Sequence, residues 1–107
     1  MIKLCSKQDL VANSGVCARY QDKQIALFYL PQQEPSVFAV DNWDPIGKAN
    51  VMSRGIVGSI GDELVVASPL YKQRFSLRSG QCLDDQTEVL TVYPVELNGE
   101  SVTLLLD

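Results

Sequence analysis

Two short proline turns are the places in this chain where a metal ion or a reacting group would most readily be held. The first reads Asp44-Pro45-Ile46 and the second reads Ser68-Pro69-Leu70-Tyr71. Asp44 and Ser68 offer oxygen atoms, but two oxygen ligands do not make a calcium or magnesium site. Asp and Ser at the start of a turn commonly accept hydrogen bonds from backbone amides inside that turn. The residue types therefore predict a structural role for both side chains.

The side chains that usually bind metals or attack substrates are scarce. The chain contains no histidine, which excludes a Ser-His-Asp triad and removes the commonest metal ligand. Its cysteines, Cys5, Cys17 and Cys82, are odd in number and form no CxxC pair. We therefore expect buried free thiols rather than a disulfide framework or a zinc site. The adjacent Asp84 and Asp85 would point to opposite faces of an extended chain, which argues against paired-carboxylate catalysis.

The length of the chain, 107 residues, is that of one domain, and we expect a single domain over residues 1–107. The net charge is −4, but the charges are unevenly distributed. The segment from Lys48 to Arg78 contains five basic and two acidic residues. This excess is either ordinary solvated charge or a positive face that steers and docks an acidic partner. The net acidic charge argues against a general nucleic-acid binder.

Signals for a membrane, for secretion or for a nucleotide cofactor are missing. No apolar run approaches the ~20 residues of a membrane span, and the segment Met1–Cys5 lacks the long apolar region of a signal peptide. We therefore expect a cytoplasmic protein that does not contact a membrane. Gly55, Gly58 and Gly61 do not have the spacing of a dinucleotide fingerprint and indicate turns between short strands.

Short apolar segments separated by turn residues predict an all-β fold. Their β-branched and aromatic residues predict strands at residues 16–20, 25–30, 36–40, 64–67, 89–97 and 102–106. The Asn98-Gly99 pair predicts a hairpin in which Tyr93–Leu97 pairs with Val102–Leu106. Helical periodicity is weak, although Ser6 predicts a short helical turn after it. The pattern favours a β-sandwich or a partly open barrel.

The two proline turns and the segments around them resemble a Rieske iron–sulfur domain in order, spacing and turn residues. The matching segments are 40–46, 53–55, 65–71, 74–77 and 79–82. A Rieske [2Fe–2S] centre uses two Cys and two His ligands. Those four positions are occupied here by Asp44, Ile46, Ser68 and Tyr71. The resemblance implies a sandwich or partly open barrel with a smaller inserted lobe, about residues 41–82, that carries two vestigial cluster loops.

A closer resemblance covers nearly the whole chain. The string MSRGIVG at residues 52–58 is followed by VVASPLYKQ-x-F-S-L-R-x-G-Q-C, which ends at Cys82. Both strings are similar to the small subunit of the bacterial NAD(P)H-dependent nitrite reductase. The resemblance implies a non-catalytic subunit that binds and supports a large subunit containing FAD, an iron–sulfur cluster and sirohaem, which reduces nitrite to ammonia. It implies no cofactor, metal or catalytic residue in this chain, and it does not distinguish an assimilatory from a dissimilatory role or NADH from NADPH.

Without a cluster, apolar contact would have to hold the two loops together. Ile46, Leu70 and Tyr71 offer apolar surface where iron and sulfur would lie. Burial of one such side chain contributes roughly 1.5–3 kcal/mol. We therefore expect Ile46 and Tyr71 to pack against each other across the loops.

The predicted docking residues for the large subunit are one tryptophan and the basic side chains of the middle segment, namely Trp43, Arg54, Lys72, Arg74 and Arg78. Trp43 lies beside the first loop and is either a core residue or an exposed one. An exposed tryptophan next to Arg54 and Arg74 would resemble a binding hot spot, because Trp and Arg are enriched in hot spots.

A second hypothesis is a stand-alone β-barrel module that binds a peptide or an oligonucleotide. Tyr71 and Phe75 lie among Lys72 and Arg74, and aromatic side chains interleaved with basic ones are typical of single-strand binding surfaces. A third hypothesis, an independent electron carrier of unusual ligation, is disfavoured because three scattered cysteines cannot supply the four thiolates of an all-cysteine cluster.

Overall fold

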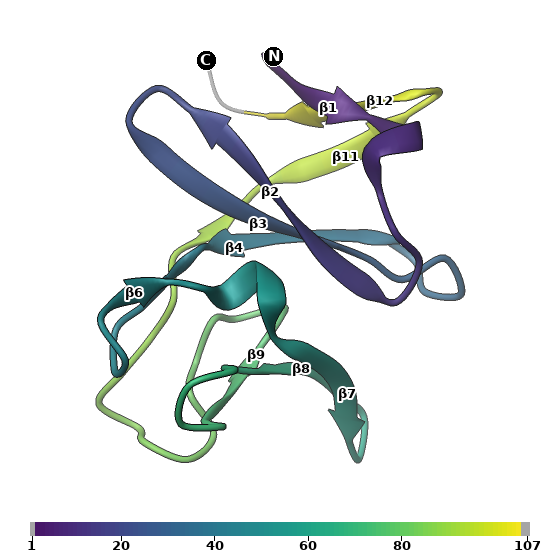
Figure 1. Ribbon diagram of the computed structural model, residues 1–107. Helices are drawn as coiled ribbons and strands as arrows, with labels where there is room; N and C mark the ends of the chain where they lie inside the picture. Colours follow the sequence, from purple (N-terminus) through teal and green to yellow (C-terminus); the bar gives the residue numbers. More distant parts are fainter. Residues whose placement is uncertain (1, 106–107) are drawn as a thin grey trace.

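The strands of the chain form two lobes stacked one above the other, as Figure 1 shows. The computed structural model describes residues 2–105. The upper lobe contains β1 (Ile2–Ser6), β2 (Ser14–Tyr20), β3 (Lys23–Tyr29), β4 (Val37–Asp41), β10 (Val92–Tyr93), β11 (Val95–Asn98) and β12 (Ser101–Leu104). The lower lobe contains β5 (Trp43–Asp44), β6 (Ala49–Asn50), β7 (Ile56–Ile60), β8 (Glu63–Ala67) and β9 (Arg74–Ser76). Two short 3-10 helices are η1 (Lys7–Asp9) and η2 (Met52–Arg54).

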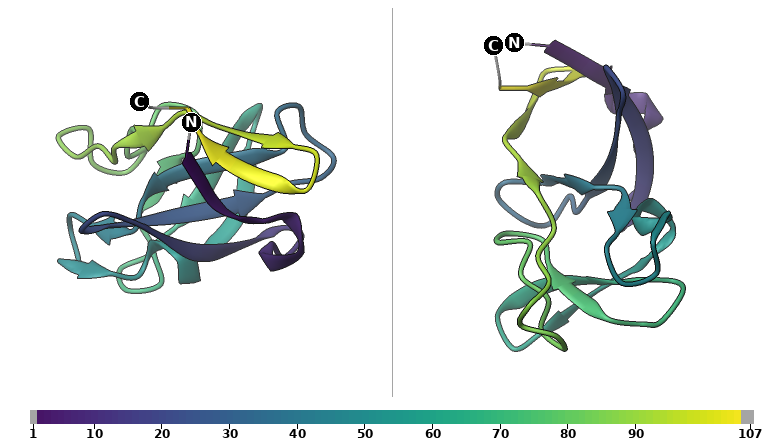
Figure 2. Two further views of the ribbon diagram at one scale, coloured as in Figure 1. Left: turned by 90° about the horizontal axis from the view of Figure 1, so that it is seen from above. Right: turned by 90° about the vertical axis from the view of Figure 1, so that its left-hand side faces the viewer.

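Two antiparallel sheets build the upper lobe, with strand orders β1-β12-β11 and β10-β4-β3-β2. The right panel of Figure 2 shows this lobe as an open ring, with β1 and β12 side by side at its far end. In the β11–β12 hairpin, Val95–Asn98 pairs with Ser101–Leu104, and Gly99 has the positive φ of 63° that the turn needs. The predicted hairpin is thus confirmed for Val95–Leu97 with Val102–Leu104. Tyr93, which was also predicted to take part, belongs to β10 and pairs with Ala39 of β4, and the predicted last residue, Leu106, lies outside the described residues.

The central strands β3 and β4 are buried on both faces. Ile25 and Leu27 of β3 lie in the core of the upper lobe. Ala26 and Phe28, which alternate with them, lie in a second core shared with the lower lobe. Because successive residues of a strand point to opposite faces, the unbroken apolar run of β3 serves both cores. The sheet that contains β3 therefore fixes the lower lobe on the upper one.

The lower lobe consists of a three-stranded sheet, β7-β8-β9, and a two-stranded ribbon, β5-β6. Its core contains Met52, Val66, Phe75 and Leu77, and it extends along the chain to Leu90. In the sheet the two hairpin partners of Val66 are Val57 and Phe75. These residues complete the core that the lower lobe shares with β3 and β4, and the loops after β5 and β8 extend from this lobe.

The structure confirms the all-β fold class but contains strands that the sequence pattern did not predict. β1 has an irregularity between Lys3 and Cys5, which breaks the apolar–polar alternation. β7 includes Gly58, where a turn was predicted; glycine weakens a strand signal because it has no side chain to pack. The turns predicted at Gly61 and after Ser6 are present. None of the helices in residues 2–105 is long and apolar enough to cross a membrane.

Candidate functional site

The first loop is held by the carboxylate of Asp44, the last residue of β5. Its Oδ1 atom accepts hydrogen bonds from the amides of Ile46 (2.9 Å) and Gly47 (3.0 Å). Its carbonyl oxygen accepts a further bond from the amide of Lys48 at 2.7 Å. Pro45 favours this turn because its ring fixes φ near the required value. These bonds confirm the structural role predicted for Asp44.

The second loop is organised in the same way by Ser68, which directly follows β8. Ser68 Oγ accepts a hydrogen bond from the amide of Leu70 at 3.2 Å. The carbonyl oxygen of Ser68 accepts one from the amide of Lys72 at 3.1 Å, and the Ser68 amide donates to the carbonyl of Gln73 at 2.9 Å. Lys72 closes the loop in the left-handed region, with φ of 67°. The hydroxyl therefore has the turn-forming role that the sequence predicts.

A buried hydrogen bond joins the two loops to each other. Ser68 Oγ donates to Asp44 Oδ2 at 2.5 Å, and both side chains are fully buried. Asp44 thus has donors on both carboxylate oxygens, two backbone amides on one and a hydroxyl on the other. A buried carboxylate without donors would be strongly destabilising. In the resemblance to Rieske domains, these two positions are those of the cysteine ligands.

The apolar contact between the loops is made by Leu70 and not by Tyr71. A Cβ atom on Gly47 would lie 2.5 Å from Leu70 Cδ1, so Leu70 rests on backbone that only glycine leaves open. Ile46 is half-buried and packs on the lower core, whereas Tyr71 is 64% exposed. The expected packing of Ile46 against Tyr71 is therefore wrong. The bond from Lys72 back to Ser68 curls the loop and leaves Tyr71 at its outer tip.

The side chains at the four ligand positions do not fit a [2Fe–2S] cluster. Such a cluster takes thiolate and imidazole donors, and none of the four supplies either. The two oxygen-bearing side chains, Asp44 and Ser68, are already bonded to each other. Among residues 2–105, no group of three or more His, Cys, Asp or Glu side chains is placed to hold a metal ion. The loops therefore form a structural element with an apolar tip.

Three of the predicted docking residues are exposed at or near these loops. Trp43 pairs with Asn50 in the β5–β6 ribbon and is 40% exposed, so of the two alternatives that the sequence left open for this residue, the exposed one is found. Because neighbouring strand residues point to opposite faces, Trp43 faces away from the buried Asp44. Arg54 and Lys72 are also exposed, at the end of η2 and in the second loop.

Arg74, another predicted docking residue, is engaged within the chain. Its guanidinium donates to both carboxylate oxygens of Asp84, at 2.6 and 3.1 Å, and its amide donates to the same carboxylate at 2.8 Å. The side-chain bonds, followed by the backbone bond, lower the pKa of Asp84 to about 2. The same pairing raises the pKa of Arg74. The positive charge of Arg74 is thus largely balanced by its own chain.

Arg78 lies away from the loops, at the other end of the β7-β8-β9 sheet. Its guanidinium carbon is 5.9 Å from the ring centroid of Phe38 in β4, a cation–π distance. Its neighbour Leu77 bonds through its amide to Leu64, near the start of β8, whereas Ser68 follows the end of β8. The structure therefore does not bring Arg78 together with the exposed residues of the loops.

The aromatic surface required by the oligonucleotide hypothesis is incomplete. Phe75 is fully buried in the lower core, so it offers no face on which a base could stack. Of the two rings on which the hypothesis depends, only Tyr71 is exposed, and one of the two does not form the predicted stacking surface. The structure thus provides no observation that favours this second hypothesis.

A buried asparagine that the sequence analysis did not single out positions the first loop. Asn42 Oδ1 accepts a hydrogen bond from the amide of Ser53 at 2.7 Å, and its Nδ2 donates to Gln24 Oε1 at 3.0 Å. Its amide donates to the Gln24 carbonyl, and its carbonyl accepts from Met52, both at 3.0 Å. Asn42 therefore joins β3, η2 and the entry to β5. The sequence signal that could have identified Asn42 is its position as a polar residue between the end of the strand predicted at residues 36–40 and Trp43.

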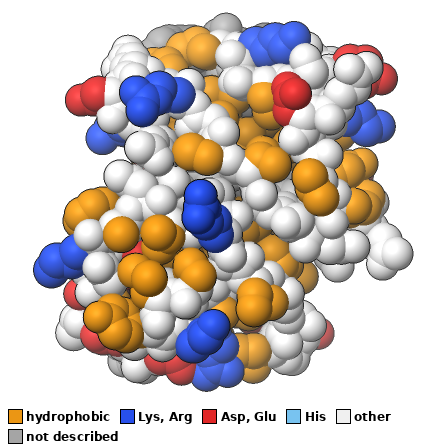
Figure 3. All heavy atoms as spheres, viewed as in Figure 1, with side chains coloured by type: hydrophobic (Ala, Val, Ile, Leu, Met, Phe, Trp, Pro, Cys, Tyr) orange, Lys and Arg blue, Asp and Glu red, His pale blue; other side chains and the backbone are white. Residues whose placement is uncertain are grey.

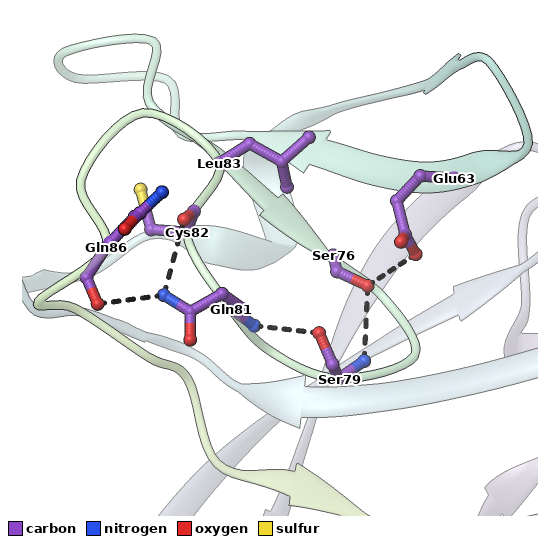
Figure 4. A pocket seen from close by; sticks show the side chains of 7 residues that line it. All are labelled: Glu63, Ser76, Ser79, Gln81, Cys82, Leu83 and Gln86. Atoms are coloured by element: carbon purple, nitrogen blue, oxygen red, sulfur yellow. Dashed lines mark hydrogen bonds between the residues drawn. The ribbon is translucent and has the colours of Figure 1, made fainter.

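A polar cavity of about 510 Å³ lies on the lower lobe, away from the loops. Figure 4 shows its lining residues Glu63, Ser76, Ser79, Gln81, Cys82, Leu83 and Gln86. Ser76 Oγ donates to Glu63 Oε2 at 2.6 Å and accepts from the amide of Ser79 at 3.2 Å. Gln81 Nε2 donates to the carbonyl of Gln86 at 3.1 Å. Ser76 is buried, so these bonds hold the surrounding turns and do not expose a nucleophile to substrate.

The three cysteines are free. Cys82 is buried and Cys5 is half-buried, but Cys17 is exposed, so the expectation of buried thiols is wrong for Cys17. Burial, with the nearby Asp9 carboxylate as a smaller cause, raises the pKa of the Cys5 thiol. A raised pKa lowers the thiolate fraction and hence the reactivity of Cys5.

Comparisons with known proteins identify the family to which this chain belongs. The sequence matches the profile of the family described as "Rieske-like [2Fe-2S] domain" over residues 1–105. It is 43% identical over 83 residues to the nitrite reductase (NADH) small subunit of Escherichia coli K12, which is 78% of this chain and 76% of that protein. A crystal structure assigned to an NADPH nitrite reductase small subunit has a TM-score of 0.93 and 50% identity, covering 98% of this chain and 97% of that chain.

Two further similarities concern longer or more distant proteins. The chain is 39% identical over 99 residues to the nitrite reductase [NAD(P)H] large subunit of Klebsiella oxytoca, which is 92% of this chain but 10% of that protein. A ferredoxin of carbazole 1,9a-dioxygenase from Nocardioides aromaticivorans has a TM-score of 0.82 at 16% identity, over 99% of this chain and 97% of that chain, which shows a shared fold alone. The chain therefore belongs to the Rieske-like [2Fe-2S] domain family and, within it, to the nitrite reductase small subunits.

Proposed function

We propose that this chain is a non-catalytic subunit that binds the large subunit of a cytoplasmic NAD(P)H-dependent nitrite reductase. In this proposal the large subunit contains FAD, an iron–sulfur cluster and sirohaem and reduces nitrite to ammonia. This chain contains no cofactor and supports assembly or turnover of its partner. The observation that carries the proposal is the closed pair of loops, in which the Asp44–Ser68 hydrogen bond lies where metal ligands would be.

The relatives support an association between this domain and a catalytic chain. Relatives of similar length have the name of a small subunit. A segment of a large subunit from Klebsiella oxytoca resembles this chain over 99 residues, so a similar domain also occurs covalently joined to a large subunit. We expect a domain that occurs both joined and separate to contact the same catalytic chain in both arrangements.

The surface that we assign to docking is the loop-tip surface, defined as Gly47, Lys48, Leu70, Tyr71 and Lys72. Leu70 and Tyr71 are 45% and 64% exposed, and both lysines are exposed. Figure 3 shows hydrophobic side chains gathered over the lower lobe, with Lys and Arg side chains between them. Exposed aromatic and aliphatic side chains beside cations fit an apolar pocket with an acidic rim, because interface centres are apolar and their rims are polar.

The other predicted docking residues are expected to contribute less to binding of the large subunit than the loop-tip surface does. Trp43 and Arg54 are exposed near the loops, and we assign them to the margin of the docking surface. Arg74 and Arg78 are held by Asp84 and by the Phe38 ring, so a partner would have to compete with contacts inside the chain. We therefore expect smaller contributions to binding from these two arginines.

Affinity capture of the tagged chain from its own cells grown on nitrite tests the proposal. The expected eluate contains a large second chain, with the visible absorbance of flavin and sirohaem, and consumes nitrite in the presence of NADH or NADPH. Untagged cells carried through the same steps provide the control. A colourless eluate that contains this chain alone, from cells in which the large subunit is present, would contradict the proposal.

A further inference from the structure

The two edges of the β7-β8-β9 sheet differ in whether other backbone segments cover them. The edge of β9 is covered, because the amide of Ser76 donates to the carbonyl of Gln81 at 2.9 Å and the amide of Leu83 donates to the carbonyl of Arg74 at 2.8 Å. The edge of β7 has no such cover: no residue in the described range 2–105 pairs with its outer side. Figure 1 shows β7 at the outer side of the lower lobe, with no strand beyond it.

The hairpin register shows which backbone groups face outward. Ile60 and Glu63 flank the two-residue loop Gly61-Asp62 and pair with each other, as the hydrogen-bonded pair that closes such a hairpin. Hydrogen-bonded and non-hydrogen-bonded pairs alternate along an antiparallel ladder. The N–H and C=O groups of Val57 and Ser59 therefore point to the free edge, where they offer two donors and two acceptors to another strand.

A groove lies beside this free edge. Its volume is about 240 Å³, and it is lined by Val57, Gly58 and Ser59 of β7 together with residues outside the strand, namely Asn13, Leu30, Gln32, Gln33 and Leu64. The leucines are buried or half-buried and provide an apolar floor. The other three residues from outside β7 carry side-chain amides that can both donate and accept. None of the lining residues is charged.

The strand itself lacks the usual protection against strand addition. β7 reads Ile56-Val57-Gly58-Ser59-Ile60 and contains neither a charged residue nor a proline. Exposed edges of natural sheets are commonly blocked by Lys, by Pro or by a bulge, and none of these is present here. The outward face is also open, because a Cβ atom added at Gly58 would have no neighbour within 4 Å.

We propose that the free edge of β7 and the groove beside it receive an extended, uncharged segment of the large subunit as an added strand. Backbone hydrogen bonds to Val57 and Ser59 would hold the segment. One apolar side chain of the segment would lie on Leu30 and Leu64 in the groove, in the manner of strand addition to a sheet edge. The inference rests on the proposed function for the identity of the partner, and it adds a second contact distinct from the loop-tip surface.

A second copy of this chain fits the edge less well than such a segment. Pairing of two five-residue strands covers only a small part of the roughly 1,200–2,000 Å² that stable interfaces bury. In a two-fold pairing, the inward residues of the other copy would be Val57 and Ser59, which already cover that copy's own core and groove. They would leave this groove empty, whereas a free segment has side chains available to fill it. The uncharged lining also favours an uncharged occupant.

The test compares two substitutions at one position, Ser59→Pro and Ser59→Ala. Both remove the hydroxyl, but only proline removes the outward N–H. Proline is tolerated on an edge strand where the N–H faces solvent, and glycine precedes it here. We expect Ser59→Pro to weaken binding to the purified large subunit about tenfold, the effect of one lost backbone bond and a blocked strand. Ser59→Ala should bind within about twofold of the unmodified chain.

Amide hydrogen exchange of the unmodified chain provides a second readout that does not depend on the folding of Ser59→Pro. The amides of Val57 and Ser59 should exchange at least about tenfold more slowly in the complex than in the free chain. If the unmodified chain binds but Ser59→Pro binds like Ser59→Ala and exchange at β7 is unchanged, this inference is overturned and the proposed function stands. If the unmodified chain does not bind the large subunit, both are overturned.

Discussion

Ser68 Oγ donates a 2.5 Å hydrogen bond to Asp44 Oδ2 in the buried space between the two loops. In Rieske domains the corresponding positions carry cysteines that bind a shared cluster, so the loops are tied through metal and sulfur. In this chain a direct hydrogen bond between a hydroxyl and a carboxylate connects the two loops. Both oxygens of Asp44 have donors, so the charge is compatible with complete burial.

The first prediction concerns the stability provided by this bond. Ser68→Ala leaves one oxygen of the buried Asp44 carboxylate without a donor, and we expect the free energy of unfolding to fall by about 2–4 kcal/mol. Urea denaturation followed by circular dichroism measures it. Asp62→Ala, at an exposed hairpin position, is the control and should change stability by less than about 0.5 kcal/mol. Equal stability of the Ser68→Ala and Asp62→Ala chains would show that the cross-loop bond is energetically unimportant.

The second prediction concerns metal content. Reconstitution of the purified chain with iron and sulfide under reducing conditions should leave no stoichiometric iron or acid-labile sulfide after desalting, because the four ligand positions lack thiolate and imidazole. A Rieske ferredoxin carried through the same steps is the positive control. Visible absorbance of a cluster in this chain, with two iron atoms per molecule, would mean that other side chains supply the ligands.

The third prediction is a pH dependence that originates at Asp84. The hydrogen bonds from the side chain and amide of Arg74 lower its pKa from 3.8 to about 2 in the folded chain. The stabilising contribution is therefore complete above about pH 4 and is lost as the pH falls through the folded pKa, towards pH 2. The ion pair is exposed to solvent, so the effect should be modest and should weaken with salt.

This pH dependence is checked by measuring the denaturation midpoints of the unmodified chain and of Asp84→Asn at several pH values between about pH 4.5 and pH 2. The difference between the two chains should shrink as the pH falls. Asp85, whose pKa is also lowered by hydrogen bonds from Thr87, is present in both chains and cancels from the comparison. A difference that stays constant down to pH 2 would contradict the assignment to Asp84.

The sequence predicts the local chemistry of the loops well, because that chemistry depends on neighbours in the chain. Asp44 and Ser68 accept bonds from amides two residues on, as their residue types and the following prolines indicate. The bond between Asp44 and Ser68 joins positions 24 residues apart. No local pattern specifies such a bond, because it depends on how the β5–β6 ribbon and the end of β8 pack.

The error over Tyr71 has a related cause. Hydrophobic character indicated that an apolar side chain would fill the space of the cluster, but residue type alone did not indicate which one. The backbone bond between Lys72 and Ser68 curls the second loop, which places Leu70 on Gly47 and leaves Tyr71 outside. Side-chain direction in an irregular loop follows from such backbone bonds and not from periodicity.

The predicted positive face shows the same limit of sequence reasoning. The excess of basic residues between Lys48 and Arg78 is present in the sequence, but in the folded chain these residues do not form one continuous positive face. Arg74 is paired with Asp84, which lies beyond the basic segment, and Arg78 lies over Phe38. A count of charges within one segment of the sequence does not include the residues from other segments that contact those charges in the folded chain.

The central claim is that the loops of this chain serve to dock a large subunit, and one measurement tests it most directly. The dissociation constant of the complex with the purified large subunit is determined for the unmodified chain, for Tyr71→Ala and for Arg78→Ala. We expect Tyr71→Ala to weaken binding about tenfold or more, as truncation of an exposed aromatic hot spot does, and Arg78→Ala to change it less than about threefold. Loss of binding in Arg78→Ala with full binding in Tyr71→Ala, or no complex at all, would contradict the account.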